Sequence, residues 1–322
     1  MNSFGRKFRV SVFGESHGTY VGICIDGCPA GIRLSSADFE HDIVRRKAGA
    51  KGTTKRVEDD TPELISGVYN GYTTGAPVTI LFANKNARSH DYEQYADIPR
   101  PGHADFVAHK KFNGYNDPRG GGHFSGRLTL PLVAAGVIAK KVIDPISVAA
   151  KLVQVGGSDD ISATIEKAMA NGDSVGGVVE CSVQNVPVGL GEPFFDSLES
   201  LLAHILFSIP AVKGVEFGAG FTSATMLGSQ HNDAIENVDG KTSTNHTGGI
   251  NGGISNGNEL TLRVAVKPTP SIAKEQQTVN LRTGERELLS VTGRHDSCIA
   301  LRVPVVVEAA VAIVLVDMLL LK

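Results

Sequence analysis

Three short segments of the sequence set a histidine or an aspartate among small and charged residues, where it could move a proton. They read GESHG at 14–18, PRPGHAD at 99–105 and GRHD at 293–296. The first two contain His17 and His103, and unperturbed histidine titrates near neutral pH, as a general acid or base should. The third presents three ionisable groups in a row and ends at Asp296. From spacing alone, a structural histidine in a turn and a helix cap at Asp105 remain open alternatives.

A basic block follows closely behind the first of these segments. Residues 45–56 read RRKAGAKGTTKR, with six basic residues and no acidic one. The glycines and threonines supply backbone N–H groups and hydroxyls beside the cations, as phosphate pockets do. The block stops at the acidic run 58–60, whereas a nucleic-acid surface would continue as a basic stripe. The pattern favours a localised anion site over a solvated helix end.

Several familiar chemistries find no support in the sequence. Neither G-x-x-x-x-G-K-[ST] nor G-x-G-x-x-G nor H-E-x-x-H occurs, and the pair Cys24 and Cys28 lacks the second half of a zinc site, so we expect no metal. Residues 14–18 match the G-x-S-x-G of serine hydrolases formally. However, residues 19–27 predict a second strand, so the segment is typical of a hairpin. A serine hydrolase centred on Ser16 and a phosphate-binding module remain the competing classes.

The composition indicates a globular protein. The chain has 322 residues, a formal charge of −3 and 41% hydrophobic residues, which excludes both a basic nucleic-acid coat and an acidic disordered tail. The N-terminus lacks an apolar core typical of a signal peptide. Glu308 and Asp317 interrupt the apolar run 303–321, so we expect no membrane span, no nucleic-acid partner and a cytoplasmic location.

The elements that must position these groups can be read from hydrophobic periodicity. Strands are predicted at Phe8–Phe13, Val21–Ile25, Leu64–Tyr69, Val78–Phe82, Val178–Val183 and Leu260–Val266. Helices are predicted at Ser36–Lys47, Leu128–Ile143, Ile161–Ala170, Leu198–Leu206 and Val305–Leu321. The strands come in consecutive groups without regular alternation with helices, and two helices are apolar on most sides. We therefore predict an α+β fold, with a helical layer between two antiparallel sheets, as a single domain over 1–322.

The motifs as a set resemble those of the chorismate synthase family. They occur in the family order as FGESHG at 13–18, DGCPAGI at 26–32, RPGHAD at 100–105, GGGHFSGRLT at 120–129, IPAVKGVEFG at 209–218, NHTGGINGGISNG at 245–257, KPTPS at 267–271 and GRHDSC at 293–298. Any one of these motifs is weak evidence for the family, but eight of them in the family order are highly specific evidence. The resemblance implies the same layered fold and a homotetramer.

The resemblance also implies a reaction. It is an anti-1,4-elimination that converts 5-enolpyruvylshikimate 3-phosphate to chorismate and phosphate, in the shikimate pathway to aromatic amino acids. The hydrogen lost from C6 is not acidic, which explains a requirement for reduced FMN in a redox-neutral reaction. Since no inserted segment has nucleotide-binding character, we expect an external flavin reductant rather than intrinsic use of NADPH.

Roles for individual residues follow from matching the family motifs. His103 is expected to protonate the leaving phosphate or stabilise its charge, His17 to do the same for the reduced flavin, and Asp296 to work with flavin N5 on the C6 proton. The substrate carries two carboxylates and a phosphate, so fixed cations are required. The expected substrate-binding residues are Arg46, Lys51, Arg100, Arg127 and Arg294.

The expected flavin pocket is also carried over by motif. Its residues are His123, Phe124, Ser125, Pro210, Ala211, Gly252, Lys267, Pro268, Thr269, Pro270, Ser271 and Arg294. This sequence departs from the usual GGGRSSARET, since His123 and Phe124 stand where the family commonly has Arg and Ser. Leu128 and Leu132 likewise replace a Glu and an Arg.

Overall fold

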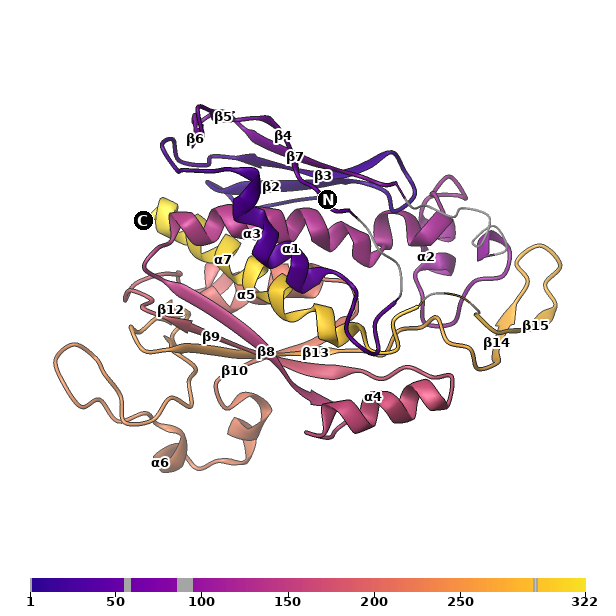
Figure 1. Cartoon of the computed structure of the whole chain (residues 1–322). Helices are drawn as coiled ribbons and strands as arrows, with labels where there is room; N and C mark the ends of the chain where they lie inside the picture. The colour runs from indigo at the N-terminus through magenta and orange to yellow at the C-terminus, as the bar shows by residue number, and fades with distance from the viewer. Residues whose placement is uncertain (1, 55–58, 86–94, 292, 294) are drawn as a thin grey trace.

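Two antiparallel sheets enclose a layer of helices in the computed structural model, which describes residues 2–54, 59–85, 95–291, 293 and 295–322 (Figure 1). The first sheet has the order β1-β2-β3-β7-β4, with β1 at Ser3–Phe4, β2 at Arg9–Gly14, β3 at Tyr20–Asp26, β4 at Glu63–Ser66 and β7 at Val78–Ala83. The second has the order β10-β13-β9-β8, with β8 at Ser147–Val155, β9 at Gly177–Gln184, β10 at Val212–Phe217 and β13 at Leu260–Val266. This arrangement confirms the predicted α+β fold.

Short ribbons extend from the two sheets. They pair β5 (Val68–Tyr69) with β6 (Tyr72–Thr73), β11 (Ile250–Asn251) with β12 (Ile254–Ser255), and β14 (Gln276–Val279) with β15 (Arg286–Leu289). The β14–β15 ribbon lies at the same end of the molecule as the helix α2, Asp105–Lys111 (Figure 1). This end also carries the PRPGHAD segment.

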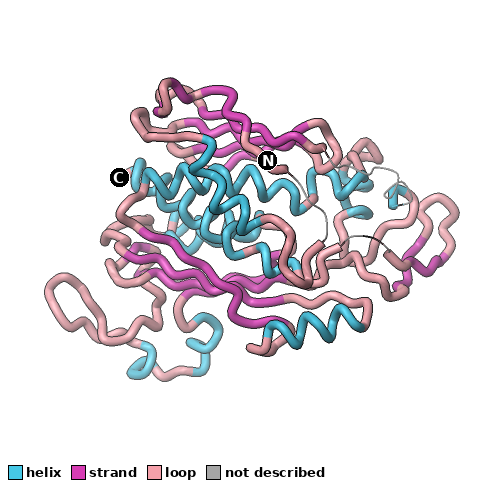
Figure 2. The backbone as a smooth tube through the Cα atoms, in the orientation of Figure 1, coloured by secondary structure: helices cyan, strands magenta, loops and turns pink. Residues whose placement is uncertain are grey.

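The helices between the sheets are apolar because they are covered on nearly every side. The layer contains α1 (Glu40–Arg46), α3 (Thr129–Val142), α5 (Leu198–Ser208) and α7 (Pro304–Leu321). Two further helices, α4 (Ile161–Ala170) and α6 (Gly228–His231), lie outside it, beyond the second sheet (Figure 1). Figure 2 shows the long helices α3 and α7 running through the middle layer. Gly136 lets them approach closely, since a Cβ there would lie 2.3 Å from that of Ala309. Their side chains form one hydrophobic core with the inner faces of both sheets.

Two carboxylates in α7 are buried and accept several hydrogen bonds each. Asp317 accepts hydrogen bonds from the backbone N–H groups of residues 6–8, at 2.6–3.0 Å. Glu308 accepts from Arg45 and Lys140 at 2.6–2.8 Å and from the backbone of Ala150. By length and composition α7 could cross a membrane, but 78% of it is buried inside the protein, as expected for a core helix.

Several predicted boundaries were wrong. The expected strand Leu64–Tyr69 is two strands, because Gly67 between them has φ +78°. A Cβ placed on Gly67 would lie only 2.7 Å from the carbonyl oxygen of Pro77. The expected helix Ser36–Lys47 begins as a 3₁₀ turn at Ser36–Phe39 and becomes α-helical only at Glu40. The sequence reading missed β8, β10, β14 and β15 altogether.

Candidate active site

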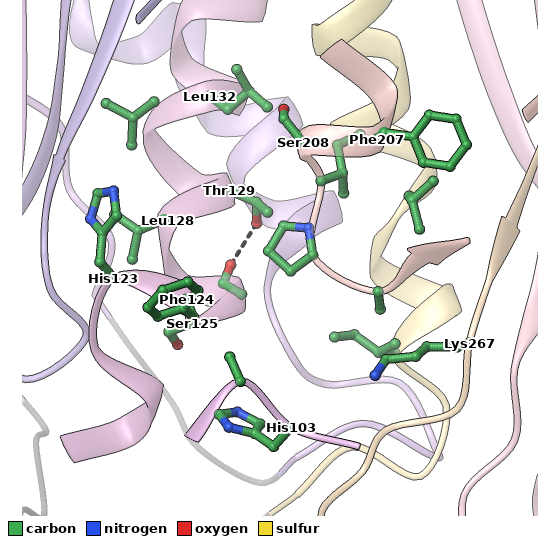
Figure 3. Close-up of a pocket in the computed structure, with 18 of the residues that line it drawn as sticks. His103, His123, Phe124, Ser125, Leu128, Thr129, Leu132, Phe207, Ser208 and Lys267 are labelled. Carbon is green, nitrogen blue, oxygen red and sulfur yellow. Dashed lines mark hydrogen bonds between the residues drawn. The ribbon is translucent and has the colours of Figure 1, made fainter. Parts of the chain in front are cut away.

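A cavity of about 650 Å³ opens beside the first turn of α3 and the last turn of α5 (Figure 3). Its lining also takes residues from β1 and β2, from the loop before α2, from the glycine-rich loop 120–126, and from residues 267–271 after β13. Segments that are far apart in the sequence therefore meet here. Three of the eight motifs, at 100–105, 120–129 and 267–271, contribute lining residues, together with Ile209–Val212 from a fourth.

His103 lines this cavity and is held by a buried ion pair. Its Nδ1 lies 2.5 Å from Oδ1 of Asp105. Arg100 grips the same carboxylate through Nε and Nη2, at 2.8 and 2.9 Å, and reaches Ser271 through Nη1 at 3.2 Å. Burial acts to raise the pKa of Asp105, but the hydrogen bonds from Arg100 and His103 outweigh it and hold the pKa well below its usual range. Asp105 is therefore ionised near neutral pH.

The glycine triplet of the loop 120–126 brings the two predicted catalytic histidines to one place. An ideal Cβ on Gly120 would lie 2.5 Å from Cδ2 of His17, and one on Gly121 would lie 3.4 Å from Nε2 of His103. The GESHG segment connects β2 to β3 as an antiparallel hairpin, as predicted. It is thus no strand-to-helix elbow of the kind that activates a hydrolase serine.

A cluster of buried charges lies directly behind the cavity wall. Arg46 donates to Oγ1 of Thr129 at 3.0 Å and to the carbonyl of Gly126 at 2.8 Å, and both of those residues line the cavity. Arg127 forms a salt bridge with Asp60, which also lies 3.9 Å from Arg46. Burial and the nearby Arg302 lower the pKa of Arg46 to about 9, so it stays protonated at neutral pH.

Asp296 belongs to the same cluster. Its Oδ1 accepts the backbone N–H of Thr54 at 2.7 Å, and its Oδ2 accepts from Arg302 at 3.1 Å. Arg302 in turn donates to the carbonyl of Arg46 at 2.8 Å. The neighbouring His295 is partly buried, and this burial together with the positive charges of Arg100 and His103 lowers its pKa. His295 and Asp296 therefore lie between the charge cluster and the His103 loop.

Most of the expected flavin residues surround the cavity. The lining includes His123, Phe124, Ser125, Pro210, Ala211, Lys267, Thr269, Pro270 and Ser271. His123 contacts the carbonyl of Gly14 at 2.8 Å and the side chain of Asn2 at 3.1 Å, so its ring is fixed to the first sheet. Phe124 packs against Phe112 with ring centres 6.3 Å apart.

The opposite wall carries polar groups that are only partly satisfied by hydrogen bonds within the described residues. Lys267 donates to the carbonyl of Gly102 at 2.6 Å, and its backbone N–H donates to Ala211, whose φ is +75°. Oγ1 of Thr269 is buried and has no hydrogen-bond partner among the described residues. A buried hydroxyl without a partner is costly, so this atom is suited to a ligand.

Other predicted residues lie elsewhere. Lys51 is exposed and pairs with Glu166 of α4 at 2.5 Å, and Gly252 lies in the β11–β12 turn with no atom within 4 Å of its ideal Cβ. The cavity lining found among the described residues includes neither of these two. It also leaves out five other predicted residues: Pro268, His17, Arg46, Arg127 and Asp296. Arg294 lies outside the described residues.

Sequence reasoning missed several partners of the predicted groups. Asp60 and Arg302 complete the charge cluster, and Asp105 completes the His103 site. Asp60 stood in the acidic run that ends the basic block. Asp105 stood in the PRPGHAD motif, where a helix cap was one open alternative. In the structure its oxygens accept from Arg100 and His103 instead. Only Arg302 had no signal in its neighbouring sequence.

Comparisons with known proteins agree on one family. The family model described as chorismate synthase matches residues 8–320. A chorismate synthase of Chitinophaga pinensis is 64% identical, with 100% of this chain and 97% of the relative covered, and one of Dehalococcoides mccartyi is 47% identical, with 99% and 96% covered. A crystal structure of chorismate synthase superposes with a TM-score of 0.77 at 28% identity, over 99% of this chain and 93% of that one. The chain therefore belongs to the chorismate synthase family, whose members are lyases of the shikimate pathway.

Proposed function

We propose that this chain converts 5-enolpyruvylshikimate 3-phosphate to chorismate and phosphate, with reduced FMN as its cofactor. The observation that carries the proposal is the shared cavity. His103 and nine of the residues expected from family motifs to bind flavin line one space of about 650 Å³, within the range of small-molecule sites. Neither a serine hydrolase nor a phosphate-binding module needs this combination.

The residues around the cavity fit a flavin. Phe124, Leu132 and Ile299 supply apolar surface, while Lys267 supplies a cation on another side. The unpartnered hydroxyl of Thr269 could hydrogen-bond a polar edge of the ring system. Reduced FMN, when bound there, supplies electron density to the substrate ring as the phosphate departs.

The proposed role of His103 is to deliver a proton to the leaving phosphate. Its Nδ1 is occupied by Asp105, so Nε2 is the nitrogen left to face a ligand. A protonated imidazole at that position would neutralise the charge that develops on the phosphate. His17, on the other side of Gly120, is proposed to serve the reduced flavin in the same way.

The charge cluster is proposed to hold the anionic substrate. Among the described residues, the cluster sets three cations, Arg46, Arg127 and Arg302, against the two carboxylates of Asp60 and Asp296, which leaves one positive charge in excess. A phosphate or carboxylate would compensate that excess charge, and arginine forks suit both. Asp296, an acceptor when ionised, is the proposed recipient of the C6 proton.

The chain is proposed to act as one domain, supported by a core that takes residues from Phe8 to Met318. We also propose a cytoplasmic homotetramer that receives electrons from an external flavin reductant rather than from NADPH directly. Lys51, Gly252 and Pro268 have no support from the cavity, and Arg294 stays a prediction.

An anaerobic assay tests the function. Purified chain, substrate and FMN are combined with dithionite, and chorismate is measured by chromatography. We expect product only when FMN and the reductant are both present, and none with NADPH as the sole reductant. Formation of chorismate with oxidised FMN and no electron source would contradict the proposed mechanism, and turnover with NADPH alone would contradict the external reductant.

A further inference from the structure

The carboxylate of Asp105 is surrounded by donors on all sides. Its Oδ2 accepts from the backbone N–H and the Nε of Arg100, at 3.1 and 2.8 Å. Its Oδ1 accepts from Nη2 of Arg100 at 2.9 Å and lies 2.5 Å from Nδ1 of His103. A carboxylate has about four acceptor sites, so all of them are used here. The side chain is only 5% exposed, which leaves little room for water to replace a partner.

This arrangement decides which nitrogen of His103 carries a proton. An ionised carboxylate can only accept hydrogen bonds, so Nδ1 must be the donor in the 2.5 Å contact. Nη2 of Arg100 also lies 3.1 Å from Nδ1, but two donors cannot bond to each other, so that approach adds no competing hydrogen bond. Nδ1 is therefore protonated in both the neutral and the charged ring. The proton that His103 can give or take is the one on Nε2, the atom that faces Gly121 at the cavity.

Arg100 holds the carboxylate with two of its side-chain nitrogens. Nε and Nη2 bind Asp105, Nη1 binds Ser271, and the guanidinium stacks on Tyr95 at 4.6 Å from its ring centre. The group is 5% exposed. Its geometry among the described residues is that of a clamp on the carboxylate.

We infer that Asp105, clamped by Arg100, is a positioning residue that fixes the tautomer and the orientation of His103. The inference rests on the proposed function for the role of His103 in catalysis.

The variant Asp105→Asn gives a directional test because an amide has one acceptor end and one donor end. If its nitrogen replaced Oδ2, it would face two donors of Arg100 that cannot become acceptors. The nitrogen therefore replaces Oδ1 and donates to Nδ1 of His103, the only partner there that can accept. The neutral ring must then carry its proton on Nε2. A charged ring would set two donors against each other, so D105N disfavours the acidic form needed for catalysis.

The experiment reads the tautomer directly. Histidine-labelled protein is studied by long-range ¹⁵N–¹H NMR above neutral pH, and the His103 signals are assigned by their loss in His103→Gln. We expect Nδ1–H in the wild-type chain and Nε2–H in D105N. With FMN and dithionite, kcat of D105N should fall about 10²-fold while KM changes little, since a general acid is lost and binding is not. Asp26→Asn, which removes a carboxylate from the surface pair with Arg9, is the matched control.

Two results would overturn the inference. One is an Nε2–H tautomer of His103 in the wild-type chain. The other is an unchanged kcat in a D105N protein whose tautomer has switched. A wild-type chain that forms no chorismate would refute the proposed function instead, and the tautomer would still decide the pairing of Asp105 with His103.

Discussion

Gly120→Ala should damage the site through a single added methyl group. The ideal Cβ at Gly120 lies 2.5 Å from Cδ2 of His17, 2.6 Å from its Nε2 and 2.9 Å from Oγ of Ser16. Ordinary contact begins near 3.4 Å, so the imidazole must retreat by about 0.9 Å, the difference between 3.4 and 2.5 Å. His17 is only 7% exposed and cannot move freely.

The expected magnitude follows from that displacement. Misplacing a catalytic group by about 1 Å lowers the rate by about 10²-fold, so kcat should fall by that factor. Overpacking a buried site should also lower the free energy of unfolding, by about 1–3 kcal/mol. Alanine at φ +60° adds about 1–2 kcal/mol of backbone strain.

Alanine variants at two other glycines separate the effect of backbone strain from the effect of the contact with His17. Gly71→Ala has the same kind of strain, with φ +76°, but nothing lies within 4 Å of its ideal Cβ. Gly121→Ala meets His103 at 3.3 Å, about 0.1 Å inside ordinary contact, and should resemble G71A more than G120A. Anaerobic kcat and denaturant unfolding are measured for all three. A kcat for G120A within about twofold of G71A would refute the assignment of a catalytic position to His17, since so small a ratio is under 0.5 kcal/mol.

Two more predictions concern carboxylates in the interior. Asp296→Asn keeps its shape and one of the two hydrogen bonds that Asp296 accepts, from Arg302 or from Thr54, but it cannot take a proton. Turnover should collapse while isothermal titration shows substrate still bound, and near-normal single-turnover rates would make Asp296 a structural residue only. Glu308→Gln leaves Arg45 and Lys140 without the carboxylate between them, so the free energy of unfolding in urea should fall by about 3 kcal/mol. As a control, Glu180→Gln at the surface pair with Lys151 should have little effect. Burial acts to raise the pKa of Glu308, but hydrogen bonds and charges from Arg45 and Lys140 lower it below the ordinary 4.5, so its contribution is present above pH 4.5 and lost as pH falls through the depressed value. Wild-type stability should therefore drop on acidification more steeply than that of E308Q, and parallel curves would contradict this origin.

Elements with strong local periodicity could be predicted from the sequence. Helix α4 and strand β13 have the predicted bounds, because side chains repeating at one face fix a helix or a strand within a few residues. Strand β8 was missed because its Ala, Lys and Gln residues have weak strand preference, and its hydrogen bonds come from β9, about thirty residues away. The partner strand, not the local sequence, makes β8 a strand.

The residue types by themselves determined what chemistry the chain could do: histidines in rigid loops, cations in glycine-rich segments, and the motif order of one family. Tertiary structure decided which of those residues meet. Lys51 and Arg46 stand five positions apart in one basic block, yet Lys51 faces solvent beside Glu166 while Arg46 is buried behind the cavity. Asp105, for which a helix cap was one open alternative, holds His103. Local sequence cannot distinguish these outcomes, because the free energy of a charged side chain depends on the partners and the burial that distant segments supply.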